Sequence, residues 1–456
     1  MKENHSTLLT EGSIWKKIIV FAIPIFIGNV FQQLYNTVDS LIVGNFIGND
    51  ALAAVSSSGN LIFLLVGFFN GIAMGAGVII SKYFGAKDYK KLQLAIHTDV
   101  AFGLVASVIL TVLGIIFTPQ ILTWMGTPES VLPNSIIYFR IYFVGATAVV
   151  MYNIAVGILQ AIGDSRHPLY YLIISSIVNV VLDLFFVAVL KLGVGSAALA
   201  TVISQAISAI LCFYRLMHYD TVYKVSWRKI RFDGSMLKQI IQLGLPSGIQ
   251  NSIIGFANVI VQSNINVFGV NAMAGCGAYT KIEGFAFLPI TCFSMALTTF
   301  VGQNLGAGKL DRVKKGAKFG IICSVTMAEI VGVAIWIGAP VLIRLFNDDP
   351  AVIAFGIKQA KTEALFYFLL AFSHCIAGIM RGAGKAIVPM ITMLITWCLI
   401  RITYITVAVH LVPKIGVIFW AYPLTWGLSS IIFLTYYKKV DWIHNFERLE
   451  GKRIKI

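Results

Sequence analysis

The sequence predicts an all-α polytopic membrane protein with twelve transmembrane helices in two six-helix lobes, related by a parallel internal repeat. Three observations support this fold class. They are an apolar composition, apolar stretches of helical length along the whole chain, and landmark residues that recur at a fixed spacing. Each of them indicates a chain that folds in lipid rather than in water.

The composition lies far outside the range of soluble proteins. Of the 456 residues, 58% are hydrophobic and 12% are charged, and the mean hydropathy is +0.83. Ordinary globular chains carry about 25% charged residues. The net charge of +15 does not indicate nucleic acid, because the basic residues gather in alternate loops, as the positive-inside rule describes. We therefore expect a multi-pass protein of the inner (plasma) membrane, with both termini cytoplasmic and no nucleic-acid partner.

Twelve apolar stretches are each long enough to cross about 30 Å of hydrocarbon as a helix. Strands of an outer-membrane barrel would instead alternate in polarity over about 10 residues, and the sequence has no such pattern. The spans expected in the first half are 15–40, 52–80, 94–117, 135–160, 168–190 and 195–217, and those in the second half are 237–266, 272–300, 316–343, 352–378, 386–410 and 415–437.

The two halves repeat each other at an offset of 221 residues. Six helices per unit is an even number, so both units enter the membrane from the same side and the repeat is parallel, a pattern typical of transporters. We expect an N-terminal lobe at 1–217, a cytoplasmic linker at 218–236, a C-terminal lobe at 237–437 and a cytoplasmic tail at 438–456. The landmarks Gly48, Gly85, Gly163, Pro168 and Gly195 match Gly269, Gly306, Gly384, Pro389 and Gly416.

Polar residues inside a span are the main functional candidates, because ionisable groups in a membrane are costly unless they face a cavity or a partner. The first span carries a polar stripe at helical spacing that includes Asn29, Gln33 and Asn36 and ends at Asp39. In span 168–190, Asn179 and Asp183 share one helical face. We expect the polar stripe of the first span to contribute to a substrate cavity.

Asp39 and Asp183 come from two helices of one lobe and could converge on one small cation. A sodium ion is possible at Asp39, Asn179 and Asp183, with a hydroxyl such as that of Thr201 completing an all-oxygen shell. Two neighbouring carboxylates could equally bind a proton. The sequence leaves the choice between H+ and Na+ open and indicates no cofactor beyond this coupling ion.

The second half keeps the polar stripe but not the acids. Gln250, Asn251 and Asn258 lie in span 237–266. When the two halves are aligned, Val261 occupies the position equivalent to Asp39, and Tyr404 occupies the position equivalent to Asp183. We therefore expect ion coupling in the first lobe and mainly substrate contacts in the second, with Glu283 as a further cavity candidate. The roles of Lys281, Arg401 and His374 stay open.

Motifs that carry enzyme chemistry are missing from the sequence. It contains no His-Glu-x-x-His and no Gly-x-Ser-x-Gly. We expect a protein that is not an enzyme. A channel would more often need rings of like groups around a pore, and no such rings are visible.

Four motifs distributed along the chain belong together. They are Pro24 with Tyr35-Asn36-Thr37-Val38-Asp39 and Gly44, then Phe84-Gly85-Ala86, Gln160-Ala161-Ile162-Gly163-Asp164 and Arg381-Gly382-Ala383-Gly384. These motifs resemble those of the MATE family, the multidrug and toxic compound extrusion transporters, and the resemblance covers essentially the whole chain. It is closest to the DinF-like branch, whose first-lobe site implies roles in ion coupling for Tyr35, Asp39, Asn179, Asp183 and Thr201. The acids of the NorM-like branch would fall near Ile254 and Leu370, which are apolar.

The resemblance implies a secondary active antiporter that exports organic cations or drugs in exchange for protons or sodium ions. Its expected partners are small cationic substrates and membrane lipid, and we expect a monomer. The alternative is a lipid-linked oligosaccharide flippase of the same wider superfamily. Such a flippase should line its cavity with basic residues to hold a pyrophosphate, and only Lys281 and Arg401 are available as deep cations.

Overall fold

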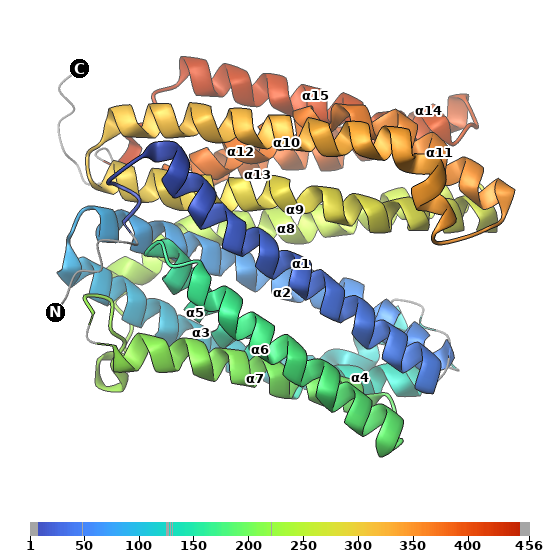
Figure 1. Cartoon of the computed structure of the whole chain (residues 1–456), viewed down its shortest axis with the longest axis horizontal. Helices are drawn as coiled ribbons and strands as arrows, with labels where there is room; N and C mark the ends of the chain where they lie inside the picture. Colours follow the sequence, from blue (N-terminus) through green and yellow to red (C-terminus); the bar gives the residue numbers. More distant parts are fainter. Residues whose placement is uncertain are drawn as a thin grey trace. The chain divides into compact units, whose positions relative to one another are not determined.

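The computed structural model describes residues 8–446 except 48, 125, 126, 128, 130 and 220, and it omits the side chains of 44 and 49–66. All regular structure in these residues is helical (Figure 1). The landmark Gly48 and the predicted tail from residue 447 onward lie outside the described residues.

The first half of the chain contains six consecutive helical segments, two of which are interrupted. The interruption at Gly145 bends its pair of helices by 50°. The segments are α1 (Ile14–Phe46), α2 (Asn49–Gly85), α3 (Tyr89–Trp124), the bent pair α4 (Leu132–Val144) and α5 (Ala146–Ala161), α6 (Arg166–Asp183) with the π-helical segment η1 (Leu184–Val189), and α7 (Gly195–His218).

Six further segments follow in the second half, after the short 3-10 helix η2 (Trp227–Lys229). Asp349 starts one of them by accepting a hydrogen bond from the Ala351 amide at 2.8 Å, an N-cap that satisfies a free helix donor. The segments are α8 (Gly234–Asn266), α9 (Val270–Gly306), α10 (Leu310–Arg344), then α11 (Pro350–Glu363), η3 (Ala364–Phe366) and α12 (Tyr367–Gly382), then α13 (Ile387–Met393), η4 (Leu394–Ile400) and α14 (Arg401–Leu411), and α15 (Gly416–Lys439).

Ten of these twelve segments are apolar enough to span a membrane by length and composition, if the bent pair of α4 and α5 counts as one span and only the described residues are considered. The two remaining segments are α2, which includes undescribed side chains, and α8. The helix α8 contains Gln250, Asn251 and Asn258, the polar stripe seen in the sequence. These residues lower its mean hydropathy.

The internal repeat is visible in the backbone of two turns. Gly163 follows α5 with φ of 88°, and Gly384 follows α12 with φ of 77°. Each glycine amide donates to the carbonyl three residues earlier, at 2.9 and 2.8 Å. Only glycine adopts this left-handed conformation without strain, so the paired glycines preserve the same turn in both halves.

The chain divides into two compact units. The first contains Ile23–Gly248, and the second contains Leu9–Ala22 together with Ile249–Ile456. Both α1 and α8 therefore pass from one unit to the other along their length. The lobe boundaries expected from the sequence stay a prediction.

Glycines let two helices of the first unit approach at backbone distance. A Cβ atom added to Gly71 of α2 would collide with the backbone of Gly248 in α8, and one added to Gly75 would collide with Gly244. Small residues at such crossings are characteristic of helix packing in membranes. This crossing brings α2 and the first part of α8 together, where Ile72 and Ile240 are buried.

A short segment before α1 is held by the turn between α9 and α10 in the second unit. The Leu9 amide donates to Gln303 Oε1 at 2.9 Å, and Lys309 Nζ donates to the Thr10 carbonyl at 2.9 Å. Arg312 donates to the Leu9 carbonyl through Nη2 and Nε at 3.0 and 3.2 Å. Leu9 and Thr10 are buried, so this segment is an integral part of the second unit.

Candidate functional site

Two carboxylates from separate helices lie together inside the first unit. Asp39 of α1 is 8% exposed, and Asp183, the last residue of α6, is 0% exposed. Their carboxyl groups are close enough to interact directly. No ion pair in the described part of the chain includes either acid. The structure thus brings together the two acids that were selected from the sequence, and no base among the residues that the structure describes forms an ion pair with them.

The helix that carries Asp183 changes its geometry at this residue. The chain continues as the π-helical segment η1, in which the Leu190 amide donates to the Phe185 carbonyl at 2.9 Å. Interruptions of this kind inside α-helices are frequent at functional sites. Asp183 therefore lies at the junction between two helical geometries.

Several polar atoms around the acids have no hydrogen-bond partner among the described residues. They are one oxygen of Asp39, both oxygens of Asp183, and both amide atoms of Asn179, which lies one turn before Asp183. A buried polar group without a partner costs about 1–3 kcal/mol, and more when it is charged. Donor oxygens of this kind fit a proton or a small hard cation such as sodium. The described residues contain no cluster of three or more His, Cys, Asp or Glu that could hold a metal.

Two tyrosines complete the surroundings of the acids. Tyr35 interacts with Asp39, and its hydroxyl accepts a hydrogen bond from Gln205 Nε2 at 3.4 Å. Tyr138 of α4 interacts with both acids. The sequence analysis selected Tyr35 but missed Tyr138, because a tyrosine within an apolar span resembles an ordinary packing residue.

Thr201 makes its hydrogen bond within its own helix. Its hydroxyl donates to the Ala197 carbonyl at 3.1 Å in α7. Ala197 packs with Tyr138 and Val43 in one buried cluster, so Thr201 lies one turn from the surroundings of the acids. Its predicted role as an ion ligand stays a prediction.

The predicted substrate-cavity residues differ in their exposure. Asn36 and Asn258 are exposed, whereas Asn29, Gln33 and Asn251 are half-buried. Gln250 is buried, and its Nε2 lies 2.9 Å from the sulfur of Met393. Three of these residues belong to the first unit and three to the second.

The second unit contains its own acids within the helices, the half-buried Glu283 of α9 and the buried Glu363 at the end of α11. Glu363 is 0% exposed, and its Oε1 accepts a hydrogen bond from Gln359 Nε2 at 3.0 Å. Glu283 was a candidate from the sequence, whereas Glu363 was not. The available signal was the Gln359–Glu363 pair at helical spacing inside an expected span, which the neighbouring lysines at 358 and 361 obscured.

Arg401 accompanies these acids and interacts with both of them. It is 3% exposed, and its Nε and Nη2 donate to Thr425 Oγ1 at 3.1 and 2.8 Å. Its guanidinium carbon lies 4.3 Å from the centre of the Tyr422 ring, a cation–π contact. Arg401 thus lies within electrostatic reach of this acidic pair but forms no ion pair with it among the described residues, and Glu283 Oε1 and Glu363 Oε2 are buried without a hydrogen-bond partner.

Outside the spans, Asp164 joins two helices of the first unit. His167 Nδ1 lies 2.8 Å from its Oδ2, and Arg215 Nε donates to the same oxygen at 3.3 Å. Burial alone would raise the pKa of Asp164, but the hydrogen bonds of His167 and the charges of His167 and Arg215 hold it below its usual value. The turn before α6 is therefore tied to the last turn of α7.

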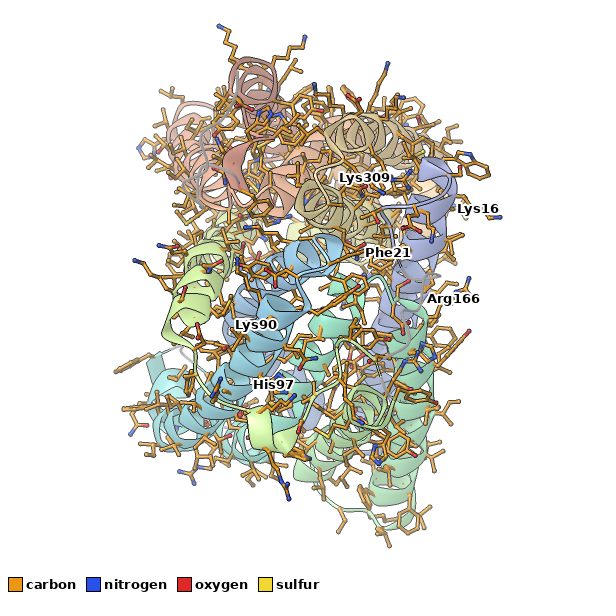
Figure 2. All side chains as sticks on the ribbon, turned by 90° about the vertical axis from the view of Figure 1, so that its left-hand side faces the viewer. Lys16, Phe21, Lys90, His97, Arg166 and Lys309 are labelled. Atoms are coloured by element: carbon orange, nitrogen blue, oxygen red, sulfur yellow. The ribbon has the colours of Figure 1, made fainter. Side chains whose placement is uncertain are left out.

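Basic residues mark one end of the helices in each unit. Figure 2 shows Lys90 and Arg166 of the first unit at the ends where α3 and α6 begin, and Lys16 and Lys309 of the second unit where α1 and α10 begin. Such charges at helix ends are typical of the segments that flank membrane spans.

The MatE family model matches this chain twice, at residues 24–185 and 246–407. The two matches have equal length and begin 222 residues apart. They contain both acids of the first unit and all three charged residues of the second-unit cluster. The repeat deduced from glycines and prolines is therefore confirmed by the comparison.

Curated relatives match nearly the whole chain. The probable multidrug resistance protein YoeA of Bacillus subtilis is 29% identical over 452 residues, covering 96% of this chain and 98% of its own length. The probable multidrug resistance protein NorM of Thermotoga maritima is 25% identical, covering 84% and 83%.

Solved structures share the fold. A multidrug resistance MATE family transporter described in an outward-facing conformation gives a TM-score of 0.89 at 22% identity, covering 99% of both chains. A MOP superfamily transporter from Pyrococcus furiosus gives the same TM-score, identity and coverage. The all-helical, membrane-embedded architecture with a duplicated unit is thus confirmed.

Proposed function

Because this chain belongs to the MATE family, we propose that it is a secondary active antiporter that exports organic cations or drugs in exchange for protons or sodium ions. The names of its relatives, which are probable multidrug resistance proteins, support this proposal. The protein acts as a monomer in the plasma membrane with both termini on the cytoplasmic side. It is not an enzyme, and the coupling ion is its only cofactor.

The single observation that carries the proposal is the buried, uncompensated acid pair. Asp39 and Asp183 interact with each other and have no base beside them among the described residues. Leaving both ionised in the interior is costly, so the pair binds a cation strongly. A coupling ion needs a site with this property.

Asp39 and Asp183 take up the coupling ion in this mechanism, and Tyr35, Asn179 and Thr201 supply the surrounding oxygens. Binding of the ion neutralises the pair and favours one conformation, because only a difference in affinity between two states shifts their balance. The substrate favours the other conformation. Competition between ion and substrate for the carrier then produces exchange.

The substrate contacts come from the polar stripes of α1 and α8 and from the acid of α9. Amide groups accept and donate hydrogen bonds to varied ligands, and a carboxylate favours cations. The proposed contacts are Asn29, Gln33, Asn36, Gln250, Asn251, Asn258 and Glu283.

Efflux from proteoliposomes tests this function. The purified chain is reconstituted, loaded with a panel of cationic dyes, and given an imposed pH gradient or sodium gradient in separate experiments. We expect at least one gradient to drive efflux and Asp39→Asn to reduce it to the rate of protein-free liposomes. Wild-type efflux that responds to neither gradient would contradict the antiporter.

The flippase alternative needs free basic groups for a pyrophosphate. Arg401 is instead engaged by Thr425 and Tyr422 and interacts with two glutamates. This engagement supports the antiporter over the flippase.

A further inference from the structure

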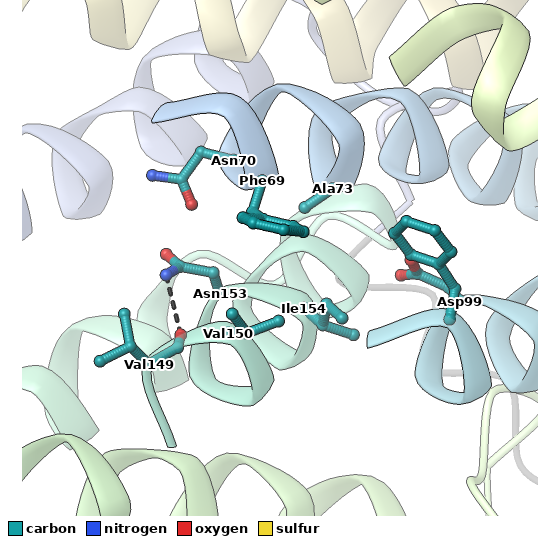
Figure 3. Close-up of a pocket in the computed structure, with 9 residues that line it drawn as sticks. Phe69, Asn70, Ala73, Asp99, Val149, Val150, Asn153 and Ile154 are labelled. Carbon is teal, nitrogen blue, oxygen red and sulfur yellow. Dashed lines mark hydrogen bonds between the residues drawn. The ribbon is translucent and has the colours of Figure 1, made fainter. Parts of the chain in front are cut away.

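A further buried carboxylate of the first unit lies in a pocket of its own. Asp99 of α3 is 2% exposed and lines a pocket between α2, α3 and α5, together with Phe69, Asn70, Asn153 and others. Figure 3 shows the two asparagines at one end of the pocket and Asp99 at the other, with Phe69 and Ala73 between them. This pocket contains neither Asp39 nor Asp183.

The carboxyl group of Asp99 is not neutralised by its surroundings. Its Oδ1 is buried and has no hydrogen-bond partner among the described residues, and no ion pair in that part of the chain includes it. The other pocket residues are phenylalanine, asparagine, alanine, valine and isoleucine, none of which titrates. An ionised carboxylate in such a place carries a penalty of several kcal/mol, so the site favours a bound positive charge.

The helix turn that carries Asp99 is held in place from the opposite side. The Ser226 amide donates to His97 Nε2 at 3.0 Å, and the Asp233 amide donates to Thr98 Oγ1 at 3.2 Å. The charges of Lys229 and Arg231 act on His97, which faces the linker between α7 and α8 that contains these two residues. Asp99 is thus directed into the pocket, while its basic neighbours lie on the linker side.

The size and chemistry of the pocket select its occupant. The space that the centre of a water molecule can occupy in it is about 10 Å³, which is close to the roughly 10–15 Å³ that a single water needs and far too small for a drug-sized ligand. Sodium prefers a full shell of oxygen ligands, and around Asp99 the walls are mostly carbon. Asn153 is oriented by its Nδ2 bond to the Val149 carbonyl at 2.8 Å (Figure 3), and an asparagine amide can hold a proton-carrying water.

We propose that Asp99 is a reversible proton-binding site of the first unit, separate from Asp39 and Asp183, that adds a proton to the exchange. A proton binds to a carboxylate oxygen and neutralises it, which removes the cost of an ionised group among the apolar walls of the pocket. This inference rests on the proposed antiport but concerns a different carboxylate.

Infrared difference spectroscopy on the full chain in lipid vesicles tests the site, because a protonated carboxyl group has its own carbonyl band. Spectra are recorded between acidic and alkaline buffer for wild type, Asp99→Asn and the control Asp348→Asn, which removes an exposed loop acid. We expect Asp99→Asn to lose one pH-dependent protonated-carboxyl component that Asp348→Asn keeps. Identical wild-type and Asp99→Asn spectra would overturn the proposal, as would an Asp99 component that never changes with pH.

Two further measurements complete the test. Addition of sodium at fixed pH is expected to leave the Asp99 component unchanged, and its loss would make Asp99 a sodium site instead. In proteoliposomes, we expect Asp99→Asn to exchange one proton fewer than wild type for each dye molecule exported. An unchanged ratio of protons to dye would overturn the coupling role. If Asp99→Asn does not fold, two other variants replace it. Asp99→Glu must keep a pH-dependent protonated-carboxyl band at a shifted frequency. Asn153→Leu, which keeps Asp99, must shift the frequency of the Asp99 band.

Failure of the site and failure of the proposed function are distinguishable. Wild-type vesicles that show no gradient-driven efflux would contradict antiport, whereas the infrared spectra would still report whether Asp99 binds a proton. Gradient-driven efflux together with an unchanged Asp99→Asn spectrum would contradict only the Asp99 site.

Discussion

In the first half of the chain Asp39 and Asp183 interact without a base beside them among the described residues, whereas in the second half Arg401 lies within electrostatic reach of Glu283 and Glu363. No ion pair in the described residues joins Arg401 to either glutamate. Glu283 Oε1 and Glu363 Oε2 are buried without a hydrogen-bond partner, as are oxygens of Asp39 and Asp183, so the nearby base is the feature that differs between the halves. We therefore predict that ion coupling depends on the first-half pair rather than on Glu363.

The same divergence appears at the turns that repeat between the halves. Asp164 contacts Arg215 in the first half, and at the positions 221 residues later Lys385 Nζ donates to the Tyr436 hydroxyl at 3.1 Å. The geometry of the contact is kept, but the ion pair is replaced by a hydrogen bond and a cation–π contact. The same two positions of the repeat are therefore in contact in both halves, but the residue types at these positions differ.

The largest expected effect is on transport and contrasts one acid from each half. We expect Asp183→Asn to abolish gradient-driven efflux from proteoliposomes, because the cation site loses a charge. We expect Glu363→Gln to stay within about threefold of wild type, since only differential ion affinity drives the cycle. Equal loss in both variants would remove the distinction between the halves.

A second variant makes the second half resemble the first. We expect Arg401→Gln to lower the free energy of unfolding by about 1.5–3 kcal/mol, because Thr425 loses its two charged hydrogen-bond donors. Thermal unfolding in detergent measures this effect. The double variant Arg401→Gln/Glu363→Gln should recover part of the loss, and no recovery would show that Arg401 stabilises the fold by packing alone.

A smaller effect concerns the ion pair at the turn before α6. We expect Asp164→Asn to cost about 2 kcal/mol at neutral pH, within the range for hydrogen bonds to charged groups. The pKa of Asp164 is lowered in the folded protein, so its contribution is present above the unfolded pKa of about 3.9. It is lost as the pH falls through the lower folded value.

Unfolding curves for Asp164→Asn and wild type should therefore converge in acid. Lys385→Met, at the equivalent position of the second half, serves as the control because its hydrogen bond to Tyr436 involves no carboxylate. A gap between Asp164→Asn and wild type that is constant down to low pH would rule out the ion pair as the cause.

The smallest expected effect compares two helix positions. Gly71→Ala should lower the free energy of unfolding by about 1–2 kcal/mol, because the new methyl group meets the backbone of α8. Gly277→Ala in α9 meets nothing within 4 Å and should be neutral, or stabilising by up to about 1 kcal/mol. Thermal unfolding of both variants provides the measurement, and equal shifts would show that the α2–α8 crossing is loose.

The fold could be predicted because its signals are periodic and repeated. Apolar stretches identify helices one by one, and glycines such as Gly163 and Gly384 occupy turns that only glycine tolerates. The interruptions within helices could not be predicted. A π-helical segment after Asp183 and a bend at Gly145 depend on tertiary packing, which leaves no periodic signal in the sequence.

The candidate site could be predicted only in part. Asp39 and Asp183 were found because an acid in an apolar span is rare, and the structure places them together. Asp99 was missed because it lies in the outer part of a long helix that begins among charged residues, where an acid looks like a surface group. Glu363 was missed because Lys358 and Lys361 come shortly before it in the same span. Tyr138 carries no charge, so only its position beside the acids shows its relevance.

The segment from Leu9 to Gly12 has a consequence for how the protein is made. Leu9 binds Gln303, a residue 294 positions later in the chain. A ribosome adds about 5–20 residues per second, so roughly 15–60 seconds pass between the synthesis of these two partners. During that interval α1 enters the membrane with its leading segment unattached. The segment from Leu9 to Gly12 is therefore made before its partners in the second unit and is fixed in place only after they have been made.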